Sequence, residues 1–370
     1  MFKKYYYNNS ALIIYIIEEK VKFYAIVING FYKYFKEMFQ RFVIKVKKKQ
    51  QKNLVKKTAN NQIIMLLQVS GRTDICALYP KWFVNRLKAG YILVRNPYNE
   101  HQVSHVDVTP EVVDCICFCT KDPKAIVPYL TQIDSMGYNY YFMVTITAYD
   151  LDIEPGLRPK LEIMKTFIEL SKMLGKKRVI WRYDPVLLNQ RYTKVFHYKM
   201  FEKMCQLLFP YTETVIISFL DIYKNIIGKF DELTDHDVIE LAQRFGKIAQ
   251  KYQLHIQTCS EKYHLEEYGI AKGSCLDRGY IETLIGYPLD IKTNTNRANC
   301  SCLASIDIGA YSCCNHGCSY CYACNHNLVA KNMAIHDDES PMLLGTLSYD
   351  DKVNKRIVAS NKVRQIKLDI

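Results

Sequence analysis

The sequence contains no uninterrupted apolar run of the roughly 18–20 residues that a transmembrane helix needs. The apolar stretches at 11–17 and 23–31 are separated by the charged segment EEKVK. No secretory signal with a cleavage site is recognisable, so we expect a cytoplasmic, reducing environment. No glycine-rich phosphate loop follows the first predicted strand, which disfavours a dinucleotide-binding fold.

A basic surface is missing from most of the chain, although the formal net charge is +13. Residues 1–60 hold 14 Lys/Arg and 3 Asp/Glu, whereas the remaining 310 residues hold 36 and 34. We therefore expect no nucleic-acid footprint outside residues 1–62. That segment is interpreted as a basic, aromatic-rich extension, with Met65 as an alternative start. A membrane-surface helix is the other interpretation.

The rest of the chain alternates between short apolar runs and longer segments with helical periodicity. The predicted strands are 63–69, 114–120, 140–147, 178–184, 214–221 and 254–261. The predicted helices are 80–89, 123–136, 159–174, 194–208 and 235–252, and a hairpin is expected at 91–108. Continuous apolar strands spaced by helices indicate a parallel sheet buried on both faces. We predict an α/β fold, a TIM-like (β/α) barrel that is closed or partial, with a doubly wound open sheet as the alternative.

Charged side chains cluster at the carboxyl ends of these predicted strands. In a barrel such strand ends meet at one rim, where active sites are built. An isolated pair of this kind can equally be a structural ion pair or a helix cap. The predicted catalytic or substrate-binding residues are Arg72, Asp74, Lys121, Arg182, Asp184 and Glu261.

The cysteines gather near the C-terminus, where seven of the 14 lie between Cys300 and Cys324. Cys314, Cys318 and Cys321 form a C-x3-C-x2-C motif, which we call the motif cysteines. This spacing fits one face of a [4Fe–4S] cluster better than it fits the paired C-x2-C knuckles of zinc sites. Zinc, and cysteines that are free or form disulfides, remain the alternatives. Cys300 or Cys302 is a candidate fourth ligand.

These residues resemble the domain of unknown function 1848 family. The resemblance runs from SGRTDICALYPKWFVNRLKAGYILVRNPYN through CFCTKDP, VIWRYDPVLL, ISFLDIY and IGAYSCCNHGCSYCYA to SPMLLG and RQIKLDI, over residues 63 to 370. Here Gly71 and Cys76 stand where the family commonly has Arg and Pro, and Cys119 stands where many relatives have Trp.

A second resemblance is carried by the C-x3-C-x-aromatic-C pattern, with Tyr320 as the aromatic residue. It is similar to the cluster motif of radical S-adenosylmethionine enzymes, and most of all to the spore photoproduct lyase branch. This resemblance implies that Cys314, Cys318 and Cys321 bind three irons, while Tyr320 belongs to the cofactor site. The open iron would bind S-adenosylmethionine. In those enzymes the motif follows the first barrel strand, whereas here it follows the last barrel unit.

The sequence thus predicts four parts: an extension at 1–62, a barrel at 63–290, a cysteine-rich segment at 291–335 and a tail at 336–370. We expect an iron–sulfur oxidoreductase or radical enzyme that acts on a small anionic substrate. The alternative function is a non-enzymatic interaction module that zinc or a closed cluster stabilises.

Overall fold

The computed structural model describes residues 65–293 and 299–363. The chain divides into two units, residues 1–62 and 63–370. The described residues all belong to the second unit, and the interpretations of residues 1–62 concern residues outside the described ranges. No helix in the described ranges is long and apolar enough to cross a membrane.

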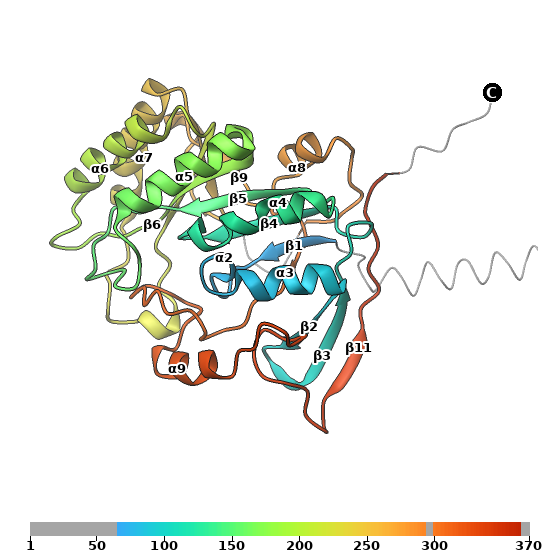
Figure 1. Cartoon of the computed structure of the whole chain (residues 1–370). Coiled ribbons are helices and arrows are strands. Elements are labelled where there is room, and N and C mark those ends of the chain that lie inside the picture. The colour runs from blue at the N-terminus through green and yellow to red at the C-terminus, as the bar shows by residue number, and fades with distance from the viewer. Residues whose placement is uncertain (1–64, 294–298, 364–370) are drawn as a thin grey trace, which may run out of the picture. The chain divides into compact units, whose positions relative to one another are not determined.

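The second unit is built on one eight-stranded sheet with the strand order β10-β1-β4-β5-β6-β7-β8-β9. Figure 1 labels β1, β4, β5, β6 and β9 of this sheet. Every neighbouring pair in it is parallel. The strands are β1 (Leu66–Val69), β4 (Cys115–Thr120), β5 (Tyr140–Thr145), β6 (Val179–Val186), β7 (Thr214–Phe219), β8 (His255–Cys259), β9 (Ala271–Gly273) and β10 (Ile306–Asp307). The six predicted strands are therefore confirmed.

The described pairings leave this sheet open. The strands follow one another in the order that a barrel requires, without the reversal of a doubly wound sheet. Within the described ranges, however, no ladder of hydrogen bonds joins β9 to β10. A parallel α/β sheet with barrel order is thus present, and the strands that the structure describes do not close it by pairing.

Helices follow most strands, as βαβ connections require. They are α2 (Ile75–Leu78), α3 (Pro80–Ala89), α4 (Leu130–Ser135), α5 (Lys160–Leu174), α6 (Lys194–Leu208), α7 (Asp235–Lys251), α8 (Arg278–Ile285) and α9 (His326–Ala334). Figure 1 shows α3, α4 and α5 lying along strands β1, β4 and β5. The helix predicted at 123–136 is instead two 3-10 turns, Pro123–Ala125 and Val127–Tyr129, followed by α4, because prolines interrupt the helical hydrogen bonds.

Local sequence explains the most regular elements. All six residues of β5, YYFMVT, are buried, as expected for a central strand covered on both faces. Helix α7 begins with a capping box in which Thr234 and Asp237 satisfy each other's backbone N–H groups. Gly90 and Gly286 end α3 and α8 in the left-handed conformation.

A second, three-stranded sheet holds the C-terminal tail. The predicted hairpin is present as β2 (Tyr91–Asn96) and β3 (Asn99–Asp107), and β11 (Lys352–Lys355) pairs parallel to β3. Further along, the buried carboxylate of Asp114 accepts hydrogen bonds from the backbone and side chain of Asn361 at 2.7 and 3.0 Å. The tail up to residue 363 thus packs back on the α/β unit. The final RQIKLDI segment lies outside the described residues.

His197 of α6 fixes the end of β6, which carries two predicted site residues. Its Nε2 donates to the carbonyl of Leu187 at 2.8 Å, so its Nδ1 accepts from the Tyr183 hydroxyl at 2.8 Å. Burial lowers the pKa of His197 to about 4, although the Leu187 hydrogen bond acts in the opposite direction.

We expect His197 to make the unfolding free energy depend on pH. A histidine with a lowered folded pKa contributes stability that is complete above its unfolded pKa of about 6.5 and is lost as the pH falls toward 4. The loss amounts to about 3 kcal/mol. Urea titrations between pH 7 and 4.5 should show a shallower acid decline for His197→Gln than for the wild type. His236→Gln, at an exposed position, should leave the decline unchanged. If the unfolding free energy falls equally with pH in all three proteins, His197 is not the group responsible.

Candidate functional site

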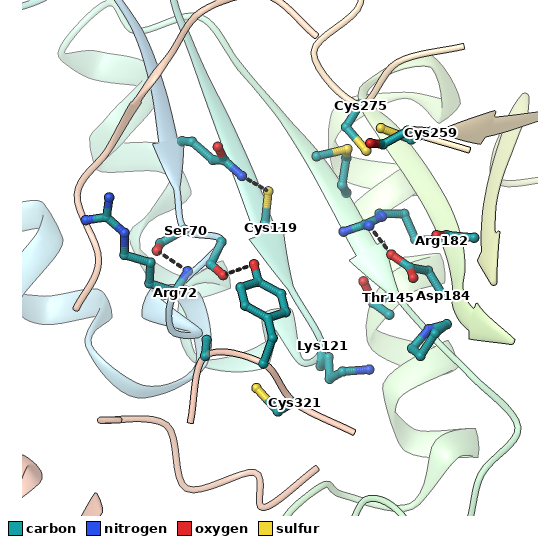
Figure 2. A pocket seen from close by; sticks show the side chains of 18 of the residues that line it. Ser70, Arg72, Cys119, Lys121, Thr145, Arg182, Asp184, Cys259, Cys275 and Cys321 are labelled. Atoms are coloured by element: carbon teal, nitrogen blue, oxygen red, sulfur yellow. Dashed lines mark hydrogen bonds and ion pairs between the residues drawn. The ribbon is translucent and has the colours of Figure 1, made fainter. Parts of the chain in front are cut away.

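A cavity of about 340 Å³ opens at the carboxyl edge of the main sheet. Six consecutive strands, β1 and β4 to β8, each contribute side chains to its wall, which shows that the sheet curves around it. These strand residues are Gln68, Cys119, Thr120, Met143, Thr145, Arg182, Asp184, Pro185, Ser218, Phe219 and Cys259. The cysteine-rich segment supplies another part of the wall (Figure 2).

Asp74 connects the loop after β1 to the cysteine motif. Its Oδ1 accepts from Ala77 N at 3.1 Å and so caps α2, while its Oδ2 accepts from Lys121 N at 2.7 Å. The Nε2 of His316, within the motif, donates to the same Oδ2 at 2.9 Å. Burial raises the pKa of Asp74, but the hydrogen bonds from His316 and Lys121 outweigh it, so the net pKa is lowered. Asp74 is therefore an ionised carboxylate that fixes the position of the motif.

Lys121 reaches a second buried carboxylate, that of Glu154. The Lys121 Nζ lies 2.8 Å from Glu154 Oε1, and Thr147 Oγ1 donates to Oε2 at 2.9 Å. Lys160 and the hydroxyl of Tyr320 also donate to this carboxylate. Burial opposes the charge of Glu154, yet the two lysines lower its pKa to about 2. Tyr320 thus places its hydroxyl on a protein carboxylate.

Arg182 and Asp184 form an ion pair on the cavity side of β6. Residues two apart in a strand point to the same face, which explains why both line the cavity. The Nε atom of Arg182 is buried and has no hydrogen-bond partner among the described residues. Burial lowers the pKa of Arg182, but the carboxylate of Asp184 and nearby thiols outweigh burial and raise it.

Arg72 lies at the opposite side of the wall, beside β10. Its backbone N–H donates to Ser70 Oγ at 2.9 Å, and Asp307 Oδ1 accepts from the same Ser70 hydroxyl at 2.7 Å. The guanidinium donates to Gly309 O at 3.3 Å and lies 5.4 Å from the ring centre of Tyr311. Both of these partners are uncharged, and no carboxylate among the described residues is paired with the Arg72 guanidinium.

Glu261 is placed differently from the other predicted residues, because it does not belong to the cavity lining. Its Oε1 accepts from Ser218 Oγ at 2.8 Å and from Phe219 N at 2.9 Å. Burial raises the pKa of Glu261, although these two hydrogen bonds act in the opposite direction. In this structure Glu261 ties the end of β7 to the end of β8.

All three motif cysteines, Cys314, Cys318 and Cys321, line the cavity, whereas the flanking Cys313 and Cys324 do not. The loop that carries them is bound to the segment after β5. Ser319 N donates to Ile153 O at 2.9 Å, and Gly156 N donates to His316 O at 2.8 Å.

That contact also explains Gly156 in the sequence EPG. A Cβ atom on residue 156 would lie 2.3 Å from the carbonyl oxygen of Asn315, so a larger residue would push the loop away. The motif loop is consequently held in place by backbone contacts that do not involve its thiols.

A second group of thiols lies across the cavity. The sulfur atoms of Cys259, Cys275 and Cys302 are all within 4.8 Å of one another, and those of Cys259 and Cys302 are 3.7 Å apart. We call these three residues the edge cysteines. Figure 2 shows Cys259 and Cys275 well separated from Cys321, with Arg182 and Asp184 between them. The structure thus places Cys302 with Cys259 and Cys275, not with the motif cysteines.

Comparison with known proteins supports the resemblance read from the sequence. Residues 66–323 match the model of a family described as domain of unknown function (DUF1848). The chain belongs to the DUF1848 family. The matched region of this DUF1848 member includes both groups of thiols and every charged residue discussed above. No curated protein matches the chain.

Sequence reasoning missed several residues of this DUF1848 site. Glu154 and Lys160 lie in the loop after β5 and at the start of α5, where neither hydrophobic periodicity nor a motif marks them. His316 lies between Cys314 and Cys318 of the motif, and this position could have identified it as a site residue. Cys259 lies near the end of a predicted strand and Cys275 lies upstream of the C-x-C pair, but nothing in the sequence indicated that these cysteines meet in space.

We expect Glu154→Gln to destabilise the protein by about 3–5 kcal/mol, because it leaves Lys121 and Lys160 without their shared buried carboxylate. Chemical denaturation at pH 7 measures this loss. Glu162→Gln is the matched control, since Glu162 makes an exposed pair with Lys165 and should change stability by less than about 1 kcal/mol. Equal effects of the two substitutions would show that the Glu154 network does not hold the site together.

Proposed function

We propose that this DUF1848 member is an iron–sulfur enzyme that binds a [4Fe–4S] cluster through Cys314, Cys318 and Cys321 and acts on a small anionic substrate in the cavity. One observation carries the proposal. The three motif cysteines face the same cavity as the cationic side chains of the strand ends, while the two flanking cysteines do not.

The donor set fits a cubane cluster better than a single ion. A cubane takes each thiolate on a different iron, so its ligand sulfurs are farther apart than those around one tetrahedral metal. Among the described residues, only the edge cysteines bring three sulfurs within 4.8 Å, and the motif cysteines do not. All 14 cysteines belong to the described part of the chain and are free thiols, so these ligands are not consumed in disulfides.

The position of Cys302 supports a cluster with one open iron. The nearest expected source of a fourth thiolate was the C-x-C pair, and Cys302 of that pair belongs to the edge cysteines. Three protein ligands would leave one iron of the cluster without a protein ligand. When bound, a cluster of this kind supplies an electron and a coordination position for a cofactor such as S-adenosylmethionine.

The placement of the motif in space also favours the radical-enzyme interpretation. Although the motif lies late in the sequence, His316 contacts Asp74 and Tyr322 donates to the carbonyl of Gly71. Both partners belong to the loop after β1, the position that the motif occupies in radical S-adenosylmethionine enzymes. The C-terminal cysteine motif of this chain therefore lies beside the loop after β1, which carries the motif itself in radical S-adenosylmethionine enzymes.

The protein's own residues would bind and orient the substrate. Arg72 and Arg182 present guanidinium groups that suit a carboxylate or phosphate, and Lys121 lies at the cavity wall between them. Asp184 holds Arg182 in place, and Glu154 does the same for Lys121. Partial burial of Lys121 and Arg182 limits their contact with water and strengthens their interaction with an anion.

The cluster is tested by anaerobic purification of the full chain with iron, sulfide and zinc assays. We expect about four irons and four sulfides per chain. Ser substitution at Cys314, Cys318 or Cys321 should remove most of the iron, whereas Cys324→Ser should retain it. Electron paramagnetic resonance of the reduced protein should change when S-adenosylmethionine is added. Zinc without iron would reject the redox function and leave the metal-stabilised interaction module.

Anion binding is tested separately with inorganic phosphate and small dicarboxylates. We expect these probes to raise the thermal midpoint of the wild type, and Arg72→Gln to lose at least half of that shift with its iron content unchanged. Lys165→Gln, which alters an exposed lysine, should behave as the wild type. An undiminished shift in Arg72→Gln would exclude Arg72 from the anion site.

A further inference from the structure

The edge cysteines come from both open edges of the main sheet. Cys259 is the last residue of β8, and Cys275 follows β9 by two residues. Cys302 lies on the other side of the opening, in the segment that leads into β10. Three thiols from distant parts of the chain therefore meet where strand pairing ends.

Their spacing matches the coordination of a single tetrahedral ion. A metal–sulfur distance of about 2.3 Å in a tetrahedron places neighbouring sulfurs about 3.8 Å apart. The Cys259 and Cys302 sulfurs are 3.7 Å apart, and all three lie within 4.8 Å of one another. This spacing also exceeds a disulfide bond of about 2.05 Å, so the group consists of separate thiols.

Cys300 is the candidate for a fourth ligand because it lies two residues before Cys302, and its sulfur lies outside the group of three that are within 4.8 Å of one another. Its thiol interacts with the thiol of Cys259, which also interacts with Cys275 and Cys302. The C-x-C spacing allows both of its cysteines to reach one ion from a short loop. Four thiolates are the ligand set of many structural zinc sites.

The surroundings compensate the charge of such a site. Zinc with four thiolates carries a net charge of −2, which is costly to bury without a cationic neighbour. Arg182 lies beside the edge cysteines and interacts electrostatically with Cys275 and Cys259 (Figure 2). Its Nε is buried without a hydrogen-bond partner in the described ranges, so it has an N–H free to donate to a metal-bound sulfur.

We propose that Cys259, Cys275, Cys302 and Cys300 bind one zinc ion that joins the two open edges of the sheet and closes it into a barrel. Two hydrogen bonds already bring these edges together. Leu303 N donates to Leu276 O at 3.0 Å, and Ser301 Oγ donates to Gly273 O at 3.3 Å. The ion replaces the missing ladder between β9 and β10 with metal–sulfur bonds, and it forms one wall of the cavity opposite the motif cysteines.

Metal analysis of the full chain, purified anaerobically, tests the site. We expect about one zinc per chain in the wild type and its loss in Cys259→Ser and Cys275→Ser. Cys119→Ser is the matched control, because Cys119 lines the same cavity without belonging to the edge cysteines. It should retain the zinc. Unchanged zinc content in Cys259→Ser and Cys275→Ser, a disulfide between Cys259 and Cys302, or iron at this position would overturn the proposal.

Cobalt substitution covers the case in which the serine variants fail to fold. Co²⁺ added to the metal-free wild type should give thiolate charge-transfer bands and the visible bands of a tetrahedral ion at about one equivalent. Addition of zinc should remove these bands. Octahedral spectra, or no thiolate bands, would show that the edge cysteines do not form this site.

The zinc site can be tested independently of the proposed iron–sulfur enzyme. Substitution of the motif cysteines should remove iron and leave zinc, whereas substitution of the edge cysteines should remove zinc. If the protein holds no iron and its zinc is lost on substitution of the edge cysteines, the closure site is supported and the iron–sulfur enzyme is rejected. If the protein holds no zinc and its iron is lost on substitution of the motif cysteines, the iron–sulfur enzyme is supported and the closure site is rejected.

Discussion

The buried carboxylate of Glu154 connects the sheet to the cysteine-rich segment. It accepts from Lys121 at the end of β4, from Lys160 at the start of α5 and from Tyr320 of the motif loop. A charge at this depth is tolerated only because two cations and two hydroxyl groups surround it. The same contacts fix three loops relative to one another, so the geometry of the cavity depends on this one ionised group. Asp74 repeats the arrangement on a smaller scale, with His316 as its partner.

The cavity combines two kinds of thiol site that differ in their spacing. The motif cysteines belong to one short loop, and backbone contacts to the segment after β5 hold that loop in place. The edge cysteines converge from three separate segments at the opening of the sheet. A cluster on one wall and a single ion on the other would serve different purposes, chemistry and closure respectively. Arg182 and Asp184 lie between them and face the space where a substrate would bind (Figure 2).

Much of the fold was accessible from the sequence, because buried parallel strands are continuous apolar runs and the helices between them are amphipathic. The strands too short to show a pattern were missed, including β9 and the two-residue β10. Of the predicted site residues, most line one cavity, as expected from their position at strand ends. Glu261 does not, because its carboxylate binds Ser218 and Phe219 instead. The position of a residue at a strand end predicts that it lies near the cavity, but it does not predict which hydrogen bonds its side chain makes there.

The sequence by itself determined the alternation of strands and helices, the clustering of charges at strand ends and the spacing of the motif cysteines. These are local properties, set by residue type and by periods of two to four residues. Only the tertiary structure decided that Cys302 lies with Cys259 and Cys275, and that Glu154 accepts a hydrogen bond from Tyr320. Such contacts join residues 16 to more than 160 positions apart, and they depend on how loops close over the sheet. No local pattern encodes that closure, because it results from the packing of the whole unit.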